Sequence, residues 1–155
     1  MKKILIALDY NPSAEKIAET GHKLAKAMGA STFLLHVYSD ASYYATLSYS
    51  PIMGFAGFND LDTIQSHAVE EMQRVAQNYL DKTKHHLDDE TIQTVVRNGD
   101  FAETILNTAK DLNIDIVVIG SHSRHGLEKI LSGSTAEKVL HHSSIPVFII
   151  PVKEV

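Results

Sequence analysis

Apolar residues occur along the chain in two alternating patterns, short uninterrupted runs and longer stretches with helical spacing. The short runs are bounded by Gly, Pro, Asn or Asp, which predicts strands that are buried on both faces. We expect five such strands, at residues 4–8, 32–37, 92–97, 114–119 and 145–152. Strands of this kind are typical of a parallel sheet with helices on both sides.

Four helices are expected between these strands. The first follows Ser13, a candidate N-cap, and stops at Gly29, and the third begins with the capping-box-like pair Asp100 and Glu103. The other two cover residues 64–80 and 127–140. The alternation predicts an α/β fold, an open doubly wound five-stranded parallel sheet with helices on both faces. If the winding direction reverses after the third strand, the strand order is 3-2-1-4-5.

Composition narrows the class of protein. A chain of 155 residues with 44% hydrophobic content suits a single domain, residues 1–155, with one core. The net charge of -5 argues against nucleic-acid binding, which needs a large basic face. Cysteine is absent, which excludes disulfides and thiolate chemistry. No apolar run is long enough for a signal sequence or a membrane span, so we expect a soluble cytoplasmic protein.

The segment 39–62 is long for a connection and rich in aromatic residues, Gly and Pro. Three interpretations stay open: a lid over a ligand, a surface that faces a partner protein, or packing over the edge of the sheet.

The chemistry is expected at the carboxyl ends of the first and fourth strands, where the winding direction reverses. Asp9 follows the first strand, and its carboxylate suits ribose hydroxyls, although a turn or cap role is the plainer alternative. The fourth run stops at Gly120, and the polar, glycine-containing turn after it suits phosphate groups. Tight turns or helix packing would also explain Gly120 and Gly133. Val37, at the end of the second strand, can flank a base.

Several motifs together resemble the universal stress protein family over essentially the whole chain. They are ILIALD at the start, LLHV, Asn98-Gly99, DIVVIGSHSRHG and GSTAEKVLHHSSIPVFIIP. The resemblance implies a small α/β domain that is usually a homodimer. Its nucleotide-binding members carry Gly, two residues, Gly, nine residues, then Gly-Ser or Gly-Thr. Gly120 and Gly133-Ser134 match this motif, whereas Ser123 replaces its middle glycine.

The resemblance also implies a ligand and a set of contacts. The ligand is ATP, AMP or another adenine nucleotide, with or without Mg²⁺. Asp9 is expected at the ribose, and Gly133, Ser134 and Thr135 at the phosphates. The predicted site also contains Ala7, Leu8, Val37 and Ile119 around the adenine, and Gly120, Ser121, Ser123 and Arg124 on the phosphate side. Ser123 can either obstruct the backbone approach of a phosphate or donate a hydrogen bond to it.

Three functions compete at this stage. The leading one is a dimeric stress-response regulator that binds an adenine nucleotide and pairs through residues 145–152. The alternative is a nucleotide-independent dimeric module that engages an unidentified protein partner through segment 39–62. An ATP-hydrolysing enzyme is not expected, because no nucleophile with its base and no paired carboxylates can be identified, and His122 or His125 could at most position water. No metal site is expected either.

Overall fold

The computed structural model describes residues 1–39, 61–123 and 135–153. Its elements, in chain order, are β1 (Lys3–Ala7), α1 (Ala14–Ala27), β2 (Ser31–Tyr38), α3 (Leu61–His86), β3 (Gln93–Asn98), α4 (Phe101–Asp111), β4 (Ile116–Ser123), α5 (Thr135–His142) and β5 (Val147–Lys153). All neighbouring strands pair in parallel, in the order β3-β2-β1-β4-β5. The predicted fold class and strand order are confirmed.

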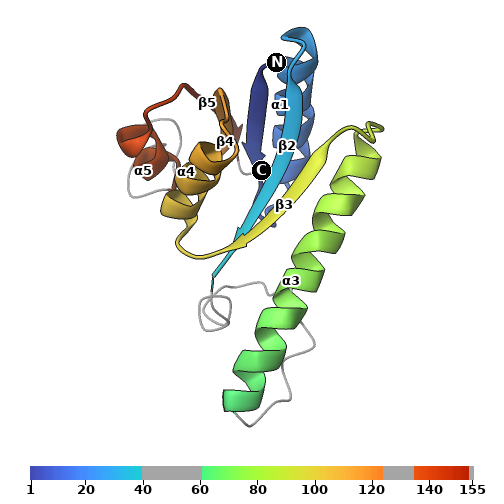
Figure 1. The fold of residues 1–155 in the computed structure, drawn as a ribbon, viewed down its shortest axis with the longest axis vertical. Coiled ribbons are helices and arrows are strands. Elements are labelled where there is room, and N and C mark those ends of the chain that lie inside the picture. Colours follow the sequence, from blue (N-terminus) through green and yellow to red (C-terminus); the bar gives the residue numbers. More distant parts are fainter. Residues whose placement is uncertain (40–60, 124–134, 154–155) are drawn as a thin grey trace.

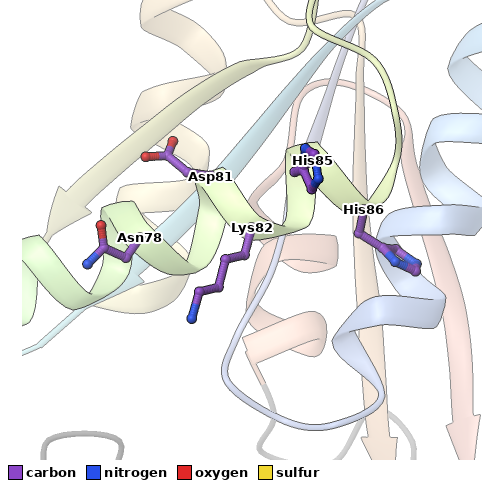
Figure 2. A pocket seen from close by; sticks show the side chains of 5 residues that line it. All are labelled: Asn78, Asp81, Lys82, His85 and His86. Atoms are coloured by element: carbon purple, nitrogen blue, oxygen red, sulfur yellow. The ribbon is translucent and has the colours of Figure 1, made fainter.

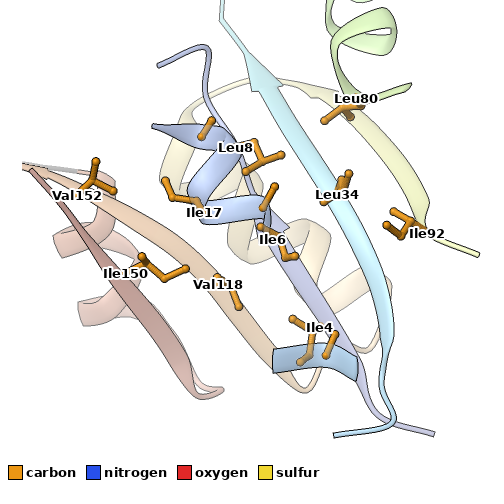
Figure 3. Close-up of a cluster of buried hydrophobic side chains, with 13 residues drawn as sticks. Ile4, Ile6, Leu8, Ile17, Leu34, Leu80, Ile92, Val118, Ile150 and Val152 are labelled. Atoms are coloured by element: carbon orange, nitrogen blue, oxygen red, sulfur yellow. The ribbon is translucent and has the colours of Figure 1, made fainter. Parts of the chain in front are cut away.

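Helices lie on both faces of the sheet (Figure 1), and each face has its own apolar core. One core lies under α1 and α3 and contains Ile6, Ile17 and Leu34, which Figure 3 shows together. The other lies under α4 and α5 and contains Leu35 and Val117. Leu34 and Leu35 are consecutive, both completely buried, and belong to opposite cores. Consecutive side chains of a strand point to opposite faces, so helices on both faces explain the uninterrupted apolar runs.

Helix ends follow local rules in part. Asp100 caps α4, because its side chain accepts a hydrogen bond from the Glu103 amide at 3.0 Å. Ser13 occupies the N-cap position of α1 without capping it, since its hydroxyl donates instead to Asn11 Oδ1 at 2.7 Å. Gly29 has a φ of 62° just after α1, the left-handed conformation that favours glycine. No helix in the described ranges combines the length and apolar character of a membrane span.

Strand β4 is longer than the sequence pattern predicts. The turn expected directly after Gly120 is wrong, because the strand continues to Ser123. The extra residues are polar, but they pair in register with β5, from Gly120 beside Ile150 to Ser123 beside Lys153. β5 is an edge strand, which is where a sheet tolerates Pro151, a residue without an N–H group.

Candidate functional site

The central strand β1 is shorter at its carboxyl end than both of its neighbours. Its last residue, Ala7, pairs with Leu35 of β2 and Ile119 of β4. β2 then continues to Tyr38 and β4 to Ser123, while the chain after β1 turns towards α1. The end of β1 is therefore flanked by two extended strands at the point where the winding reverses, the position where open α/β sheets bind ligands.

Three of the predicted adenine contacts share one face of the sheet. Val37 and Ile119 are buried in the core under α4 and α5, and the half-buried Ala7 packs against it. Leu8 is separate from them, because it is buried in the core under α1 and α3. The structure therefore brings Ala7, Val37 and Ile119 together beside the end of β1 and places Leu8 on the opposite face.

Ser121 brings a polar group to the same region. By strand alternation its side chain shares the face of Ile119, two residues earlier in β4. The residue is 1% exposed, and in the described part of the chain its Oγ has no hydrogen-bond partner. A buried polar group left unpaired costs about 1–3 kcal/mol, and such groups in native proteins usually have a specific reason.

Asp9 lies in the turn after β1 and is exposed. Its Oδ1 accepts a hydrogen bond from the Asn11 amide at 3.0 Å, which is the turn role that the sequence left open beside the ligand role. The backbone of this turn is held by two side chains that the sequence motifs did not single out for the site. His36 Nδ1 contacts the Leu8 carbonyl at 2.8 Å, and the Tyr79 hydroxyl donates to the Asp9 carbonyl at 2.7 Å.

The protonation state of His36 follows from its position. Burial lowers the pKa of the ring below its ordinary value, while the Leu8 carbonyl and the Asp9 charge oppose that shift. A carbonyl can only accept, so Nδ1 carries the proton of the neutral ring. Nε2 is then a buried acceptor, and it has no partner in the part of the chain that the structure describes. His36 is therefore a neutral donor to the Leu8 carbonyl.

Gly120 has a packing role in the structure. A Cβ at this position would overlap Cδ1 of Ile17 in α1 and lie 3.0 Å from its Cγ1. The missing side chain lets α1 approach β4 closely, which is the helix-packing alternative that the sequence left open.

The phosphate side of the predicted site is described only in part. Ser123 ends β4, and Thr135 is the half-buried first residue of α5. Arg124, Gly133 and Ser134 lie outside the described residues, as do His125 and residues 40–60 of the aromatic segment.

A separate hollow of about 510 Å³ lies on the surface of α3. Figure 2 shows its lining, Asn78, Asp81, Lys82, His85 and His86, all carried by that one helix. Because α3 packs on the face opposite to Val37 and Ile119, this hollow is not part of the predicted nucleotide site. Within this lining, His86 Nε2 lies 2.8 Å and 3.0 Å from carboxylates of Glu19 and Glu15 in α1, and these contacts raise the pKa of His86.

Comparison with known proteins gives the family and supports the fold. The sequence model described as "Universal stress protein family" matches residues 1–151. Universal stress protein MJ0577 of Methanocaldococcus jannaschii is 30% identical over 98% of this chain and 96% of its own length. A solved structure of the MJ0577 protein superposes with a TM-score of 0.70 over 99% of this chain and 98% of that one, at 25% identity.

Two further structures with the same fold contain nucleotides. A universal stress protein in complex with cAMP has a TM-score of 0.62 at 16% identity, covering 96% of this chain and 95% of that one. A universal stress protein from Archaeoglobus fulgidus in complex with dAMP has a TM-score of 0.58 at 17% identity, covering 97% and 98%. The match of the family model over nearly all residues, together with the sheet order and the relatives, shows that the chain belongs to the universal stress protein family.

Proposed function

We propose that this protein binds an adenine nucleotide, ATP or AMP, at the carboxyl ends of β1 and β4. The observation that carries the proposal is the buried hydroxyl of Ser121, which has no hydrogen-bond partner among the described residues and lies beside the shortened end of β1. The Ser121 hydroxyl is already removed from water, and it lies at the carboxyl ends of the strands, where open α/β sheets bind ligands.

The base and the sugar have complementary surroundings in the proposed complex. Ala7, Val37 and Ile119 supply the apolar surface for the adenine, and the exposed Asp9 carboxylate accepts hydrogen bonds from ribose hydroxyls. The Ser121 hydroxyl donates to the nucleotide from the β4 side. Arg124, Gly133, Ser134 and Thr135 are proposed to hold the phosphates, with Ser123 in the position of the family's middle glycine.

Support also comes from the relatives. One universal stress protein was solved with cAMP and another with dAMP, two ligands that share the adenine ring and differ in the sugar and phosphate. We therefore expect adenine recognition to be the constant part of binding and the phosphate contacts to be specific to this chain.

We also propose that the protein acts as a homodimer that pairs through β5. This strand is an edge of the sheet, and Phe148 within it is 41% exposed. An apolar edge strand is a pairing hazard unless a second strand covers it, and a copy of the same strand is the simplest cover.

A thermal-shift titration with ATP, AMP and GTP tests nucleotide binding. At a ligand concentration of 100 times Kd, stability rises by about 2.7 kcal/mol, which is a clear increase in Tm. Asp9→Ala should reduce the shift for both adenine nucleotides. Asp111→Ala is the matched control, because this exposed aspartate ends α4 near Lys3, at the amino ends of the strands and away from the proposed site, and should leave the shift unchanged. No shift with ATP or AMP, in protein purified free of ligand, would refute the proposal.

A further inference from the structure

The turn that carries Asp9 is held from outside by two distant elements. Residues Leu8 and Asp9 follow the last register pair of β1, and the Leu8 amide still donates to the Leu35 carbonyl of β2 at 2.8 Å. His36 in β2 donates to the Leu8 carbonyl at 2.8 Å, and Tyr79 in α3 donates to the Asp9 carbonyl at 2.7 Å. Two consecutive peptide groups of the turn are therefore fixed by side chains 28 and 70 residues away in sequence.

The two donors are held in place by mutual packing with Tyr10, the next residue of the turn. The Tyr10 ring lies 4.2 Å from the His36 ring and 5.1 Å from the Tyr79 ring, centroid to centroid. The His36 and Tyr79 rings are themselves 5.8 Å apart, and their planes meet at 65°. Edge-on contacts such as those that Tyr79 makes with Tyr10 and His36 are favourable for aromatic rings. The cluster of Tyr10, His36 and Tyr79 thus orients both donors towards the turn.

The use of a histidine here has a cost that a purely structural cluster would avoid. His36 is 2% exposed, and its Nε2 has no partner among the described residues. A leucine or phenylalanine would fill the same volume without burying an unpaired acceptor, but it could not donate to the Leu8 carbonyl. The energetic cost of burying the unpaired Nε2 of His36 is therefore linked to the hydrogen bond that fixes the turn backbone.

We propose that Tyr79 and His36 are positioning residues for the adenosine end of the nucleotide site. They fix the backbone of Leu8 and Asp9 and thereby the direction of the Asp9 carboxylate. This inference rests on the proposed function, because it assigns to Asp9 the role of a nucleotide contact. Any displacement of α3 that breaks the Tyr79 contact weakens nucleotide binding, and by linkage bound nucleotide favours the docked position of α3.

Tyr79→Phe tests the proposal, since it removes one hydroxyl and keeps the ring in the cluster. Loss of a single net hydrogen bond predicts a Kd about three to ten times weaker for ATP, AMP and adenosine alike. The equal effect on all three is expected because the turn contacts the part that they share. Thr83→Val is the matched control, because it removes a hydroxyl that donates to the Tyr79 carbonyl, one turn further along the same helix, at 2.9 Å. This control should bind nucleotide like the wild type.

A double-mutant cycle with Asp9→Ala separates positioning from general stability. If Tyr79 acts through Asp9, Tyr79→Phe should weaken binding only while Asp9 is present, so the two effects are not additive. Additive effects, or an unchanged Kd in the single Tyr79→Phe variant, would overturn the inference and leave the proposed function intact. A wild-type protein that binds none of the three ligands would refute the proposed function, and this inference with it.

Discussion

At the scale of single residues, the structure contains three buried polar atoms without a hydrogen-bond partner in its described part: Ser121 Oγ, His36 Nε2 and His22 Nε2. The first two flank the proposed site, from β4 and from β2. The third belongs to His22 in α1, whose Nδ1 contacts Thr32 Oγ1 at 3.1 Å. Its Nε2 makes no hydrogen bond but lies 3.2 Å from an Asp89 carboxylate oxygen, a distance that forms an ion pair when the ring is protonated.

Ser121→Ala should change stability and binding in opposite directions. Removing an unpaired buried hydroxyl relieves a desolvation cost, so we expect the free protein to be as stable as the wild type or up to about 1 kcal/mol more stable. ATP affinity should fall about three- to tenfold, because the hydroxyl would no longer donate to the ligand. Urea unfolding without nucleotide and calorimetric titration with ATP measure the two effects. A loss of stability with unchanged affinity would show that Ser121 has a structural role only.

The buried histidines predict that acid weakens the fold. Burial lowers the pKa of His22, an effect that Lys26 strengthens and Asp89 opposes. The unfolded chain therefore binds a proton at this residue more readily than the folded chain, and stability falls as the pH drops below about 6.5. The contribution to the pH slope is at most about 1.4 kcal/mol per pH unit for one histidine.

This pH effect is isolated by comparing urea unfolding of the wild type and His22→Gln at pH 7.5 and 5.5. The variant should be the less stable protein at pH 7.5, and the difference should shrink at pH 5.5. His86→Gln gives the opposite sign as a control, because carboxylates of Glu19 and Glu15 raise the pKa of His86 and stabilise the fold in acid. If the loss of stability caused by His22→Gln were equal at both pH values, the lowered pKa of His22 would not explain the weakening of the fold in acid.

At the scale of elements, periodicity predicted the strands, the helices and the cap of α4, because these depend on local pattern and on burial from both sides. The extension of β4 to Ser123 could not be predicted, since its polar residues become strand only by pairing with β5. The contacts of Tyr79 and His36 with the turn after β1 are equally non-local.

For the candidate site, the end of the second strand suggested Val37, and the family resemblance suggested Ala7, Leu8 and Ile119. The sequence analysis did not separate Leu8 from the other three, although the structure places it on the opposite face of the sheet.

Gly120 tests whether a motif glycine serves packing. Gly120→Ala places a methyl group against Ile17, so we expect a destabilisation of about 1–3 kcal/mol in urea unfolding. Ile17→Ala provides the space, and in that background the added methyl should cost less or even stabilise the protein, a coupling that a cycle of the four proteins measures. If Gly120→Ala instead keeps full stability and loses ATP binding, the glycine serves the ligand.

At the scale of the whole molecule, the sheet has two edges, β3 and β5. The family-like segment GSTAEKVLHHSSIPVFIIP ends in β5. The proposed homodimer would cover β5, which packs against the core through Ile150 and Val152 and exposes Phe148.

Analytical ultracentrifugation at micromolar concentration should show twice the monomer mass for the wild type. Phe148→Glu should shift the protein to monomer, because a charge buried in an apolar interface is costly. Val69→Glu is the control, since this residue of α3 is also 41% exposed and lies far from β5 in the fold. A strictly monomeric wild type would exclude dimerisation through β5.

Pro151 in β5 also limits how further strands can add to this edge of the sheet. A strand that docks there meets a missing donor at Pro151, because by strand alternation the outward amide positions of β5 next to it are those of Ile149 and Lys153, while Ile150 and Val152 face β4. A continuous ladder of added chains, the arrangement that propagates fibrils, needs every rung. The β5 edge is therefore better suited to pairing with one partner copy than to the repeated addition of strands.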